Sequence, residues 1–280
     1  MDHQVVAKIL LRISNNFPHH ISLSFASSPN EKFYLEQVLI DELGLCYTFN
    51  SQISSFLSPS YLVSGNLENN STMKTLEEIN YFDGDANAVT SDLSNNVDIY
   101  YHGPYTLPSN LKKIYKDDKD QKSYVTFDVV PFIIMSQENI KSLFEFQRKC
   151  KFPDESTLEY FPQVYSRDLC LYECRMKKFL DLCKCIPFFY GRKNGIKQCT
   201  QNGLKCIVHN KAIIDSLRAD IDCGCLEDCN VIKYSLQRAD TMLWFHNSSV
   251  SWTVVQMKVI YKRELIHGFV EALILTGAIK

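Results

Sequence analysis

Cysteine is the residue type in this sequence whose number and spacing point most directly to a chemistry. The chain of 280 residues holds eleven cysteines, and ten of them fall between Cys150 and Cys229. Thiols at this density either form disulfides in an oxidising compartment or bind a metal such as zinc in a reducing one. The choice between these two chemistries decides in which compartment the protein works.

The spacing within this cluster favours disulfides. Zinc sites typically use C-x2-C pairs, and none occurs here. Cys170 and Cys174 lie four residues apart in a predicted helix, so their thiols share one face and lie about 6 Å apart along its axis. Cys223 and Cys225 lie two apart, and in an extended segment both would point to one side at a spacing of about 6.6 Å. Two side-by-side disulfides are therefore possible, and zinc binding remains the alternative.

Helix and strand patterns predict the elements that position these cysteines. Ser166 is a suitable N-cap for a helix that starts the cluster. A second helix is expected over residues 207–217, and the β-branched run 250–261 predicts one long strand. The first helix is predicted because apolar residues recur there at intervals of three and four: Leu169, Tyr172, Met176, Phe179 and Cys183.

The first half of the chain is expected to consist mostly of strands and turns. A helix is predicted only across residues 31–42, where the apolar residues keep an imperfect helical period. Around Val125, apolar and polar residues alternate, which predicts a strand. Residues 66–96 are interpreted as loops and turns, and the charged run 112–122 as a hairpin tip or loop.

Composition argues against several classes of function. The formal net charge is -2, and no basic stripe is interleaved with aromatics, so nucleic-acid binding is not expected. The histidines form no zinc-protease pattern, and bridged cysteines are not nucleophiles. We therefore expect no enzyme, no catalytic residue, no metal site and no cofactor. Residues 1–10 lack a signal-peptide pattern, and the apolar run 265–279 is shorter than the roughly 20 residues that span a bilayer.

Several segments together carry a more specific pattern. Residues 44–50 read GLCYTFN, residues 102–108 read HGPYTLP, and residues 147–150 read QRKC. With the ten clustered cysteines, these segments resemble the degenerin/epithelial sodium channel family of amiloride-sensitive channels, specifically its arthropod pickpocket branch. The first segment resembles a strand motif of that family, the second its H-x-P segment and the third the entry to its thumb. The match covers roughly residues 40–280.

The resemblance implies a disulfide pairing. In this pairing, Cys46 has no partner in the chain, because its family partner is expected in a segment that is absent here. The simpler interpretation of Cys46 is a buried free thiol. The bridge from Cys150 to Cys229 alone would contribute roughly 4 kcal/mol in the chain-entropy model. The implied pairs are Cys150–Cys229, Cys170–Cys225, Cys174–Cys223, Cys183–Cys206 and Cys185–Cys199.

The resemblance also implies an α+β fold. It would contain an antiparallel palm sheet and a β-ball, a disulfide-stapled helical thumb, a partial finger and the start of a second transmembrane helix. The palm sheet is expected to include residues 46–50 and strands near Val125 and Val255, while the pore and selectivity filter would lie beyond Lys280. The expected domains are a partial finger (1–45), palm and β-ball strands (46–149), the cysteine-rich thumb (150–230), a return palm strand (231–264) and the start of a truncated transmembrane helix (265–280).

The implied function is that of the extracellular domain of a ligand- or mechanically gated, amiloride-sensitive sodium channel subunit. This domain would couple a stimulus to a trimeric pore outside the chain. The implied partners are sodium as the permeant ion, further subunits of a homo- or hetero-trimer, and the lipid bilayer of the plasma membrane. The alternative is a secreted or non-conducting cysteine-rich binding protein derived from such a channel.

Two further groups of residues suit an extracellular domain. Asn69, Asn70 and Asn247 begin N-x-S/T sequons and are candidate glycosylation sites, although an Asn-rich chain yields two or three such sequons by chance. A set of acidic residues would titrate as two facing clusters if thumb and finger approach each other, the simpler interpretation being a solvated surface: Asp154, Glu155, Glu159, Glu227 and Asp228.

Overall fold

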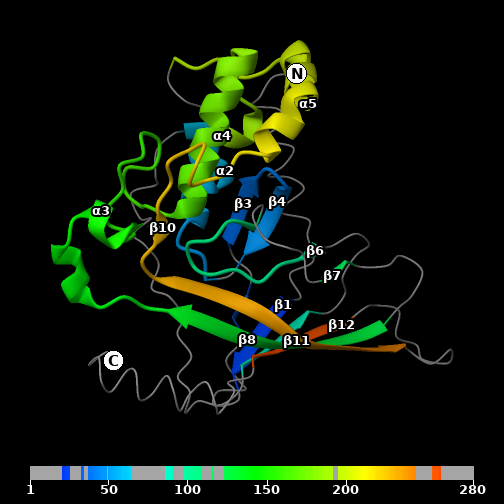
Figure 1. Cartoon of the computed structure of the whole chain (residues 1–280). Helices are drawn as coiled ribbons and strands as arrows, with labels where there is room; N and C mark the ends of the chain where they lie inside the picture. The colour runs from blue at the N-terminus through cyan, green and yellow to red at the C-terminus, as the bar shows by residue number, and fades with distance from the viewer. Residues whose placement is uncertain are drawn as a thin grey trace.

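A long twisted sheet forms one side of the molecule, and the main helices stand above it (Figure 1). The computed structural model describes residues 21–25, 33–34, 37–48, 50–64, 86–90, 98–108, 115–116, 123–191, 195–243 and 254–259. The three sequons, the charged run apart from residues 115–116, and the apolar run near the C-terminus lie outside these ranges. Within them, no helix is long and apolar enough to cross a bilayer.

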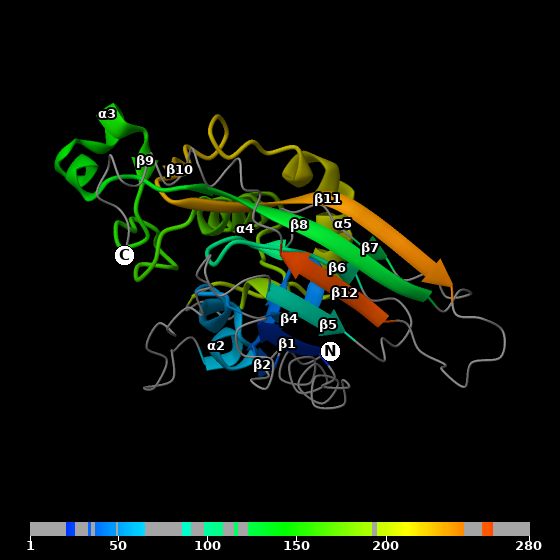
Figure 2. The ribbon, with the colours of Figure 1, turned by 90° about the horizontal axis from the view of Figure 1, so that it is seen from below.

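The large sheet has six strands in the order β11-β8-β12-β5-β1-β2, and Figure 2 shows them side by side. Neighbouring strands are antiparallel except β8 and β12, which run parallel. The strands are β1 (Ile21–Phe25), β2 (Phe33–Tyr34), β5 (Ala86–Thr90), β8 (Ser123–Ile134), β11 (Val231–Leu243) and β12 (Val254–Val259).

Three two-stranded sheets complete the strand structure. The first pairs β3 (Gln37–Asp41) with β4 (Gly44–Thr48) as an antiparallel hairpin. The second pairs β6 (Asp98–Ile99) with β7 (Tyr115–Lys116), and the third pairs β9 (Cys150–Lys151) with β10 (Glu227–Asp228) in parallel. The third sheet joins the two ends of the cysteine cluster.

Two long helices lie within the cysteine-rich region: α4 (Arg167–Cys183) and α5 (Gln201–Asp215). As the sequence predicts, α4 begins after Ser166, whose Oγ accepts a hydrogen bond from the backbone N–H of Leu169 at 3.0 Å. The shorter helices are η1 (Ser54–Leu57), α2 (Pro59–Ser64), η4 (Glu138–Ser142), α3 (Glu145–Arg148) and η5 (Phe188–Tyr190).

One apolar core lies beneath α4 and draws residues from distant parts of the chain. The inner face of α4 supplies four large side chains to it, η1 supplies two, and Ile53 directly before η1 supplies another. Since such a core excludes water from all these side chains at once, it fixes the N-terminal segments against the helices. Its members include Ile53, Phe56, Leu57, Leu107, Phe161, Leu169, Tyr172, Met176, Phe179, Ile186, Tyr190, Ile207 and Ile214.

The strand predicted around Val125 is confirmed by β8. Phe127 and Val129 are buried, while Thr126 and Asp128 are half-buried, which is the alternation of a sheet with one covered face. The predicted strand 250–261 is confirmed over the residues of β12.

Several sequence-based expectations are wrong. Residues 31–42 do not form a helix, because their described parts pair as β2 and β3 with β1 and β4. β4 belongs to a separate hairpin and not to the large sheet, and β12 runs parallel to β8. β5 lies within the stretch interpreted as loops, and the second helix begins at Gln201 instead of at residue 207. In residues 31–42, pairing with the neighbouring strands β1 and β4 outweighed the imperfect helical period.

The thiol content of the chain provides a first test of this fold. Under non-reducing conditions we expect an intact mass lower than that of the fully reduced protein by two hydrogens for each of the five bridges. Mass spectrometry before and after reduction measures this difference. A native mass that includes zinc, with freely reactive thiols, would contradict the disulfide assignment.

Candidate functional site

Five disulfides cross-link the cysteine-rich region, and three of them include a cysteine on α4 or α5. Their Cα–Cα distances range from 4.9 to 5.8 Å, within the usual span of such bonds. The structure joins Cys150 to Cys229, Cys170 to Cys225, Cys174 to Cys223, Cys183 to Cys206 and Cys185 to Cys199, the same pairs that the resemblance implies.

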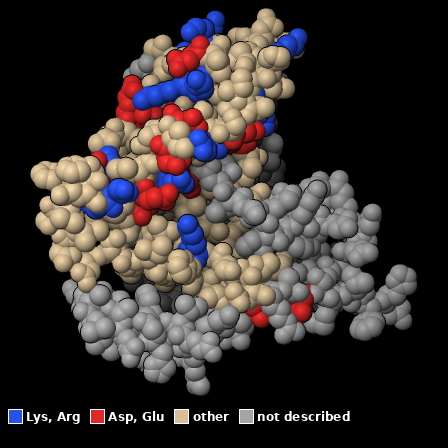
Figure 3. All heavy atoms as spheres, in the orientation of Figure 1, with Lys and Arg blue, Asp and Glu red and all other residues tan. Residues whose placement is uncertain are grey.

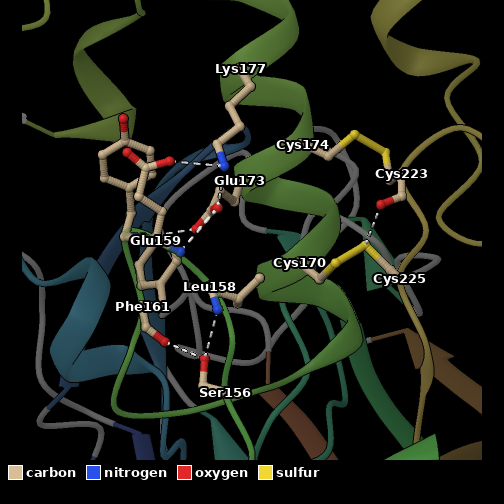
Figure 4. Close-up of polar contacts among 11 residues, drawn as sticks. Ser156, Leu158, Glu159, Phe161, Cys170, Glu173, Cys174, Lys177, Cys223 and Cys225 are labelled. Carbon is tan, nitrogen blue, oxygen red and sulfur yellow. Dashed lines mark hydrogen bonds and ion pairs between the residues drawn. A yellow bond between two sulfur atoms is a disulfide. The ribbon is translucent and has the colours of Figure 1, made fainter. Parts of the chain in front are cut away.

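Two of these bridges form a ladder on one face of α4 (Figure 4). Cys170 and Cys174 lie one helical turn apart, as predicted. The facing segment is not extended, however, because Gly224 between Cys223 and Cys225 has a φ of +65°. A turn with glycine in the left-handed region thus presents both thiols to the helix.

A buried carboxylate fastens a loop to α4 beside the disulfide ladder (Figure 4). Glu173 is only 4% exposed, and its two oxygens accept hydrogen bonds from the backbone N–H groups of Glu159 and Tyr160 at 3.2 and 2.9 Å. Lys177 Nζ lies 2.8 Å from Glu173 and 3.0 Å from the Glu159 carboxylate. Since a buried charge is costly unless it is paired and hydrogen-bonded, this network holds the loop in one position.

Residues 102–108, which we call the junction segment, contact the β3–β4 hairpin, the six-stranded sheet and α4. His102 Nε2 lies 2.6 Å from Thr48 Oγ1, at the end of β4. A Cβ on Gly103 would come within 2.6 Å of the carbonyl oxygen of Ile232 in β11, so only glycine allows this close approach. At its other end, the backbone N–H of Leu107 donates to Asp168 of α4 at 2.8 Å.

His102 of the junction segment is half-buried. Burial lowers the pKa of its imidazole below the usual value, because water no longer stabilises the charged form. Its second ring nitrogen, Nδ1, lies 2.8 Å from the carbonyl oxygen of Gly103. A neutral ring that donates to this carbonyl and accepts from the Thr48 hydroxyl satisfies both nitrogens.

Carboxylates gather where α4 begins. Asp228 of β10 accepts a hydrogen bond from the backbone N–H of Arg167 at 2.8 Å. A side chain from a strand 61 residues away thus satisfies one of the free N–H groups at the start of α4. The Arg167 side chain lies 3.0 Å from Glu227. Burial, together with the nearby charges of Asp168 and Glu227, raises the pKa of Asp228 to about 7 against the lowering effect of the Arg167 hydrogen bond.

The acidic residues singled out in the sequence do not face one another as two clusters. Asp154 pairs with Lys141 at 3.2 Å, Glu155 with Arg148 at 2.7 Å, and Glu159 with Lys177 at 3.0 Å. Glu227 and Asp228 instead contact Arg167. Figure 3 shows Lys and Arg interspersed with Asp and Glu over this face of the helices, so mixed ion pairs replace the expected facing arrangement.

Cys46, in β4, has no disulfide partner in the structure. Its Sγ lies 3.9 Å from Oδ1 of Asp41, which is fully buried in β3. Burial and then the charge of Asp41 raise the pKa of the thiol to about 12. The thiol is therefore protonated and unreactive at neutral pH.

Sequence reasoning missed the buried acids Glu173 and Glu42. A signal existed for Glu173, which follows Leu169 by four residues and precedes Met176 by three. It therefore falls on the apolar face of the predicted helix, where an acid requires a partner. No comparable signal marks Glu42, because its partners lie more than a hundred residues away.

Comparison with known families decides the affiliation of the chain. A family model described as "Amiloride-sensitive sodium channel" matches residues 9–272, which includes the whole disulfide-linked region. The chain belongs to the amiloride-sensitive sodium channel family. The family is one of ion channels and not of enzymes, and among the residues that the structure describes no group of His, Cys, Asp or Glu side chains has the arrangement of a metal site.

Two known proteins from Drosophila match parts of the chain. Sodium channel protein Nach of Drosophila virilis is 31% identical over 123 residues, which is 44% of this chain and 31% of that protein. Pickpocket protein 28 of Drosophila melanogaster is 26% identical over 149 residues, 52% of this chain and 24% of that protein. The chain thus matches at most about a third of the length of these relatives.

The reactivity of the Cys46 thiol tests the effect of the Asp41 charge on its pKa. Asp41→Asn removes the negative charge that opposes thiolate formation, so we expect faster alkylation of Cys46 by iodoacetamide at mildly alkaline pH. The rate is measured by mass spectrometry on the folded protein. A variant with an unchanged rate and unchanged stability would show that the Asp41 charge does not act on the thiol.

Asp228 gives a second test, through the pH dependence of stability. Because its folded pKa is raised to about 7, the folded chain takes up a proton that the unfolded chain does not bind until lower pH. The contribution of this group to the free energy of unfolding therefore increases as pH falls from about 8 to about 5. Asp228→Asn keeps the helix cap but should lose this increase in urea denaturation. Parallel pH profiles of the two proteins would contradict the prediction.

Proposed function

We propose that the chain is the extracellular domain of an amiloride-sensitive sodium channel subunit and couples a stimulus to a trimeric pore formed outside it. The single observation that carries the proposal is the family match over residues 9–272. The five disulfides support an oxidising, extracellular environment. One of the two named relatives is a sodium channel protein.

In this proposal the cross-linked helices α4 and α5 correspond to the thumb and the six-stranded sheet to the palm. The sheet is suited to a palm because its two longest strands, β8 and β11, run directly into the segments that carry the helices. Subunits would assemble as a homo- or hetero-trimer in the plasma membrane, with sodium as the permeant ion. The β-ball and finger would come from the N-terminal segments.

The structure supports a mechanical role for the helices. Two helices tied by covalent bonds move as one body, because a displacement at one end cannot be absorbed by separate movement of each segment. Where β8 and β11 leave the sheet, Ser136 donates its backbone N–H to Asn230 Oδ1 at 2.9 Å and its hydroxyl to the Cys229 carbonyl at 2.7 Å. The two strands are thereby joined at the point where a movement of the helices would reach the sheet.

Electrical recording tests the proposal. The complete reading frame that contains this chain, expressed alone and with candidate partner subunits, should give a sodium current that amiloride blocks, under protons, peptides, small molecules or membrane stretch as stimulus. A matched variant with Cys174→Ser and Cys223→Ser removes one bridge and should need a stronger stimulus for half-maximal current. Absence of any amiloride-sensitive current, with the protein shown to be at the cell surface, would overturn conduction and leave a non-conducting binding role.

A further inference from the structure

The turn of the β3–β4 hairpin contains a glutamate, Glu42, that has no role in the function proposed above. Glu42 lies at this turn, between Asp41 of β3 and Gly44 of β4. Its Oε2 lies 2.8 Å from Arg175 Nη1 in the middle of α4, and the two side chains are only 20% and 12% exposed. Its other oxygen, Oε1, accepts a hydrogen bond of 2.5 Å from the Tyr190 hydroxyl at the end of η5.

We infer that Glu42 is the positioning residue that makes the β3–β4 hairpin move together with α4. One carboxylate uses both oxygens on two partners from different elements, so the hairpin turn cannot shift along the helix without breaking at least one charge-assisted bond. Breaking either bond leaves a charge or a hydroxyl without its partner in a mostly water-free place, which is far costlier than breaking an exposed ion pair.

One partner of Glu42, Tyr190, is itself held in place. The Tyr190 ring is 1% exposed and lies with its centroid 4.4 Å from that of Tyr172 and 6.0 Å from that of Phe179, both on α4. Tyr172 in turn donates its hydroxyl to the Phe189 carbonyl at 2.6 Å. Through Tyr190, Glu42 is therefore bound to a group with a fixed position in the core.

The protonation states keep this contact in place at neutral pH. Burial, and after it the charge of Glu42, raises the pKa of the Tyr190 hydroxyl well above its ordinary value, so this group stays a donor. Arginine keeps its charge at any physiological pH. Both partners of Glu42 therefore remain hydrogen-bond donors at neutral pH.

The consequence concerns which parts of the molecule move together. β4 continues from the hairpin turn to Thr48, which contacts His102 of the junction segment. A displacement of the hairpin would therefore reach α4 directly at Arg175, in addition to its path through the junction segment. This inference extends the proposed function, but the contact itself exists whether or not the chain conducts ions.

Hydrogen exchange on the full chain tests the inference. In Glu42→Ala, the paired backbone amides of β3 and β4, such as Leu39 and Cys46, should exchange about tenfold faster or more under native conditions. Amides in the second half of α4 should change much less. Glu42→Gln, which keeps an oxygen for Tyr190, should have an intermediate effect. Asp215→Asn, which breaks the exposed pair with Lys211 on α5, is the matched control and should leave the hairpin unchanged.

A double-mutant cycle separates coupling from a general loss of stability. Arg175→Ala should accelerate exchange of the hairpin amides as Glu42→Ala does, and the double variant should be little faster than either single one, since the same contact is lost. Additive effects in the double variant, equal acceleration of hairpin and α4 amides, or no acceleration would each overturn the inference. Because the readout needs no current, a chain that does not conduct still gives a clear result.

Discussion

Burial of the inner face of α4 is the constraint on which the rest of the structure depends. Leu169, Tyr172, Met176 and Phe179 lie in one core with Phe56 and Leu57 of η1, although more than a hundred residues separate the two segments. Removing this apolar surface from water stabilises the fold, and each large side chain contributes about 1.5–3 kcal/mol. The disulfides then cross-link segments that the core already brings together, which restricts the unfolded chain most where the closed loop is longest.

The polar contacts around α4 serve to orient the segments that cover it. Glu173 holds the loop at Glu159 and Tyr160, Arg175 holds the β3–β4 hairpin, and Asp168 holds the junction segment. Each contact uses a charged group that is largely out of water, and such groups contribute little net stability because their desolvation is costly. What they add is a defined position, since no nearby alternative arrangement would satisfy them equally well.

Under the proposed function, these two kinds of contact would let the helices transmit a displacement. The covalent bonds and the core make α4 and α5 one body, and the polar contacts attach to it the parts that would receive a stimulus. Among the residues that the structure describes, the helices are connected to the large sheet through β8, β11 and the junction segment. A body that is rigid within itself and joined to a sheet at few places transmits movement with little loss.

The sequence by itself determined the local features and the family. The period of α4, its cap at Ser166, the alternation in β8 and the shared face of Cys170 and Cys174 depend on neighbours a few residues away, and these are legible in the chain. The cysteine pattern, read as a resemblance, also implied the bridges.

Only the tertiary structure decided which strands pair and which charges meet. Residues 33–34 and 37–41 form strands that pair with β1 and β4, and β12 runs parallel to β8, because hydrogen bonds between strands outweigh a weak local period. The partners of Glu42 lie 133 and 148 residues along the chain, and the raised pKa of Asp228 depends on burial that its own segment does not reveal. Such contacts depend on how the chain closes over long distances, which the local order of residues does not specify.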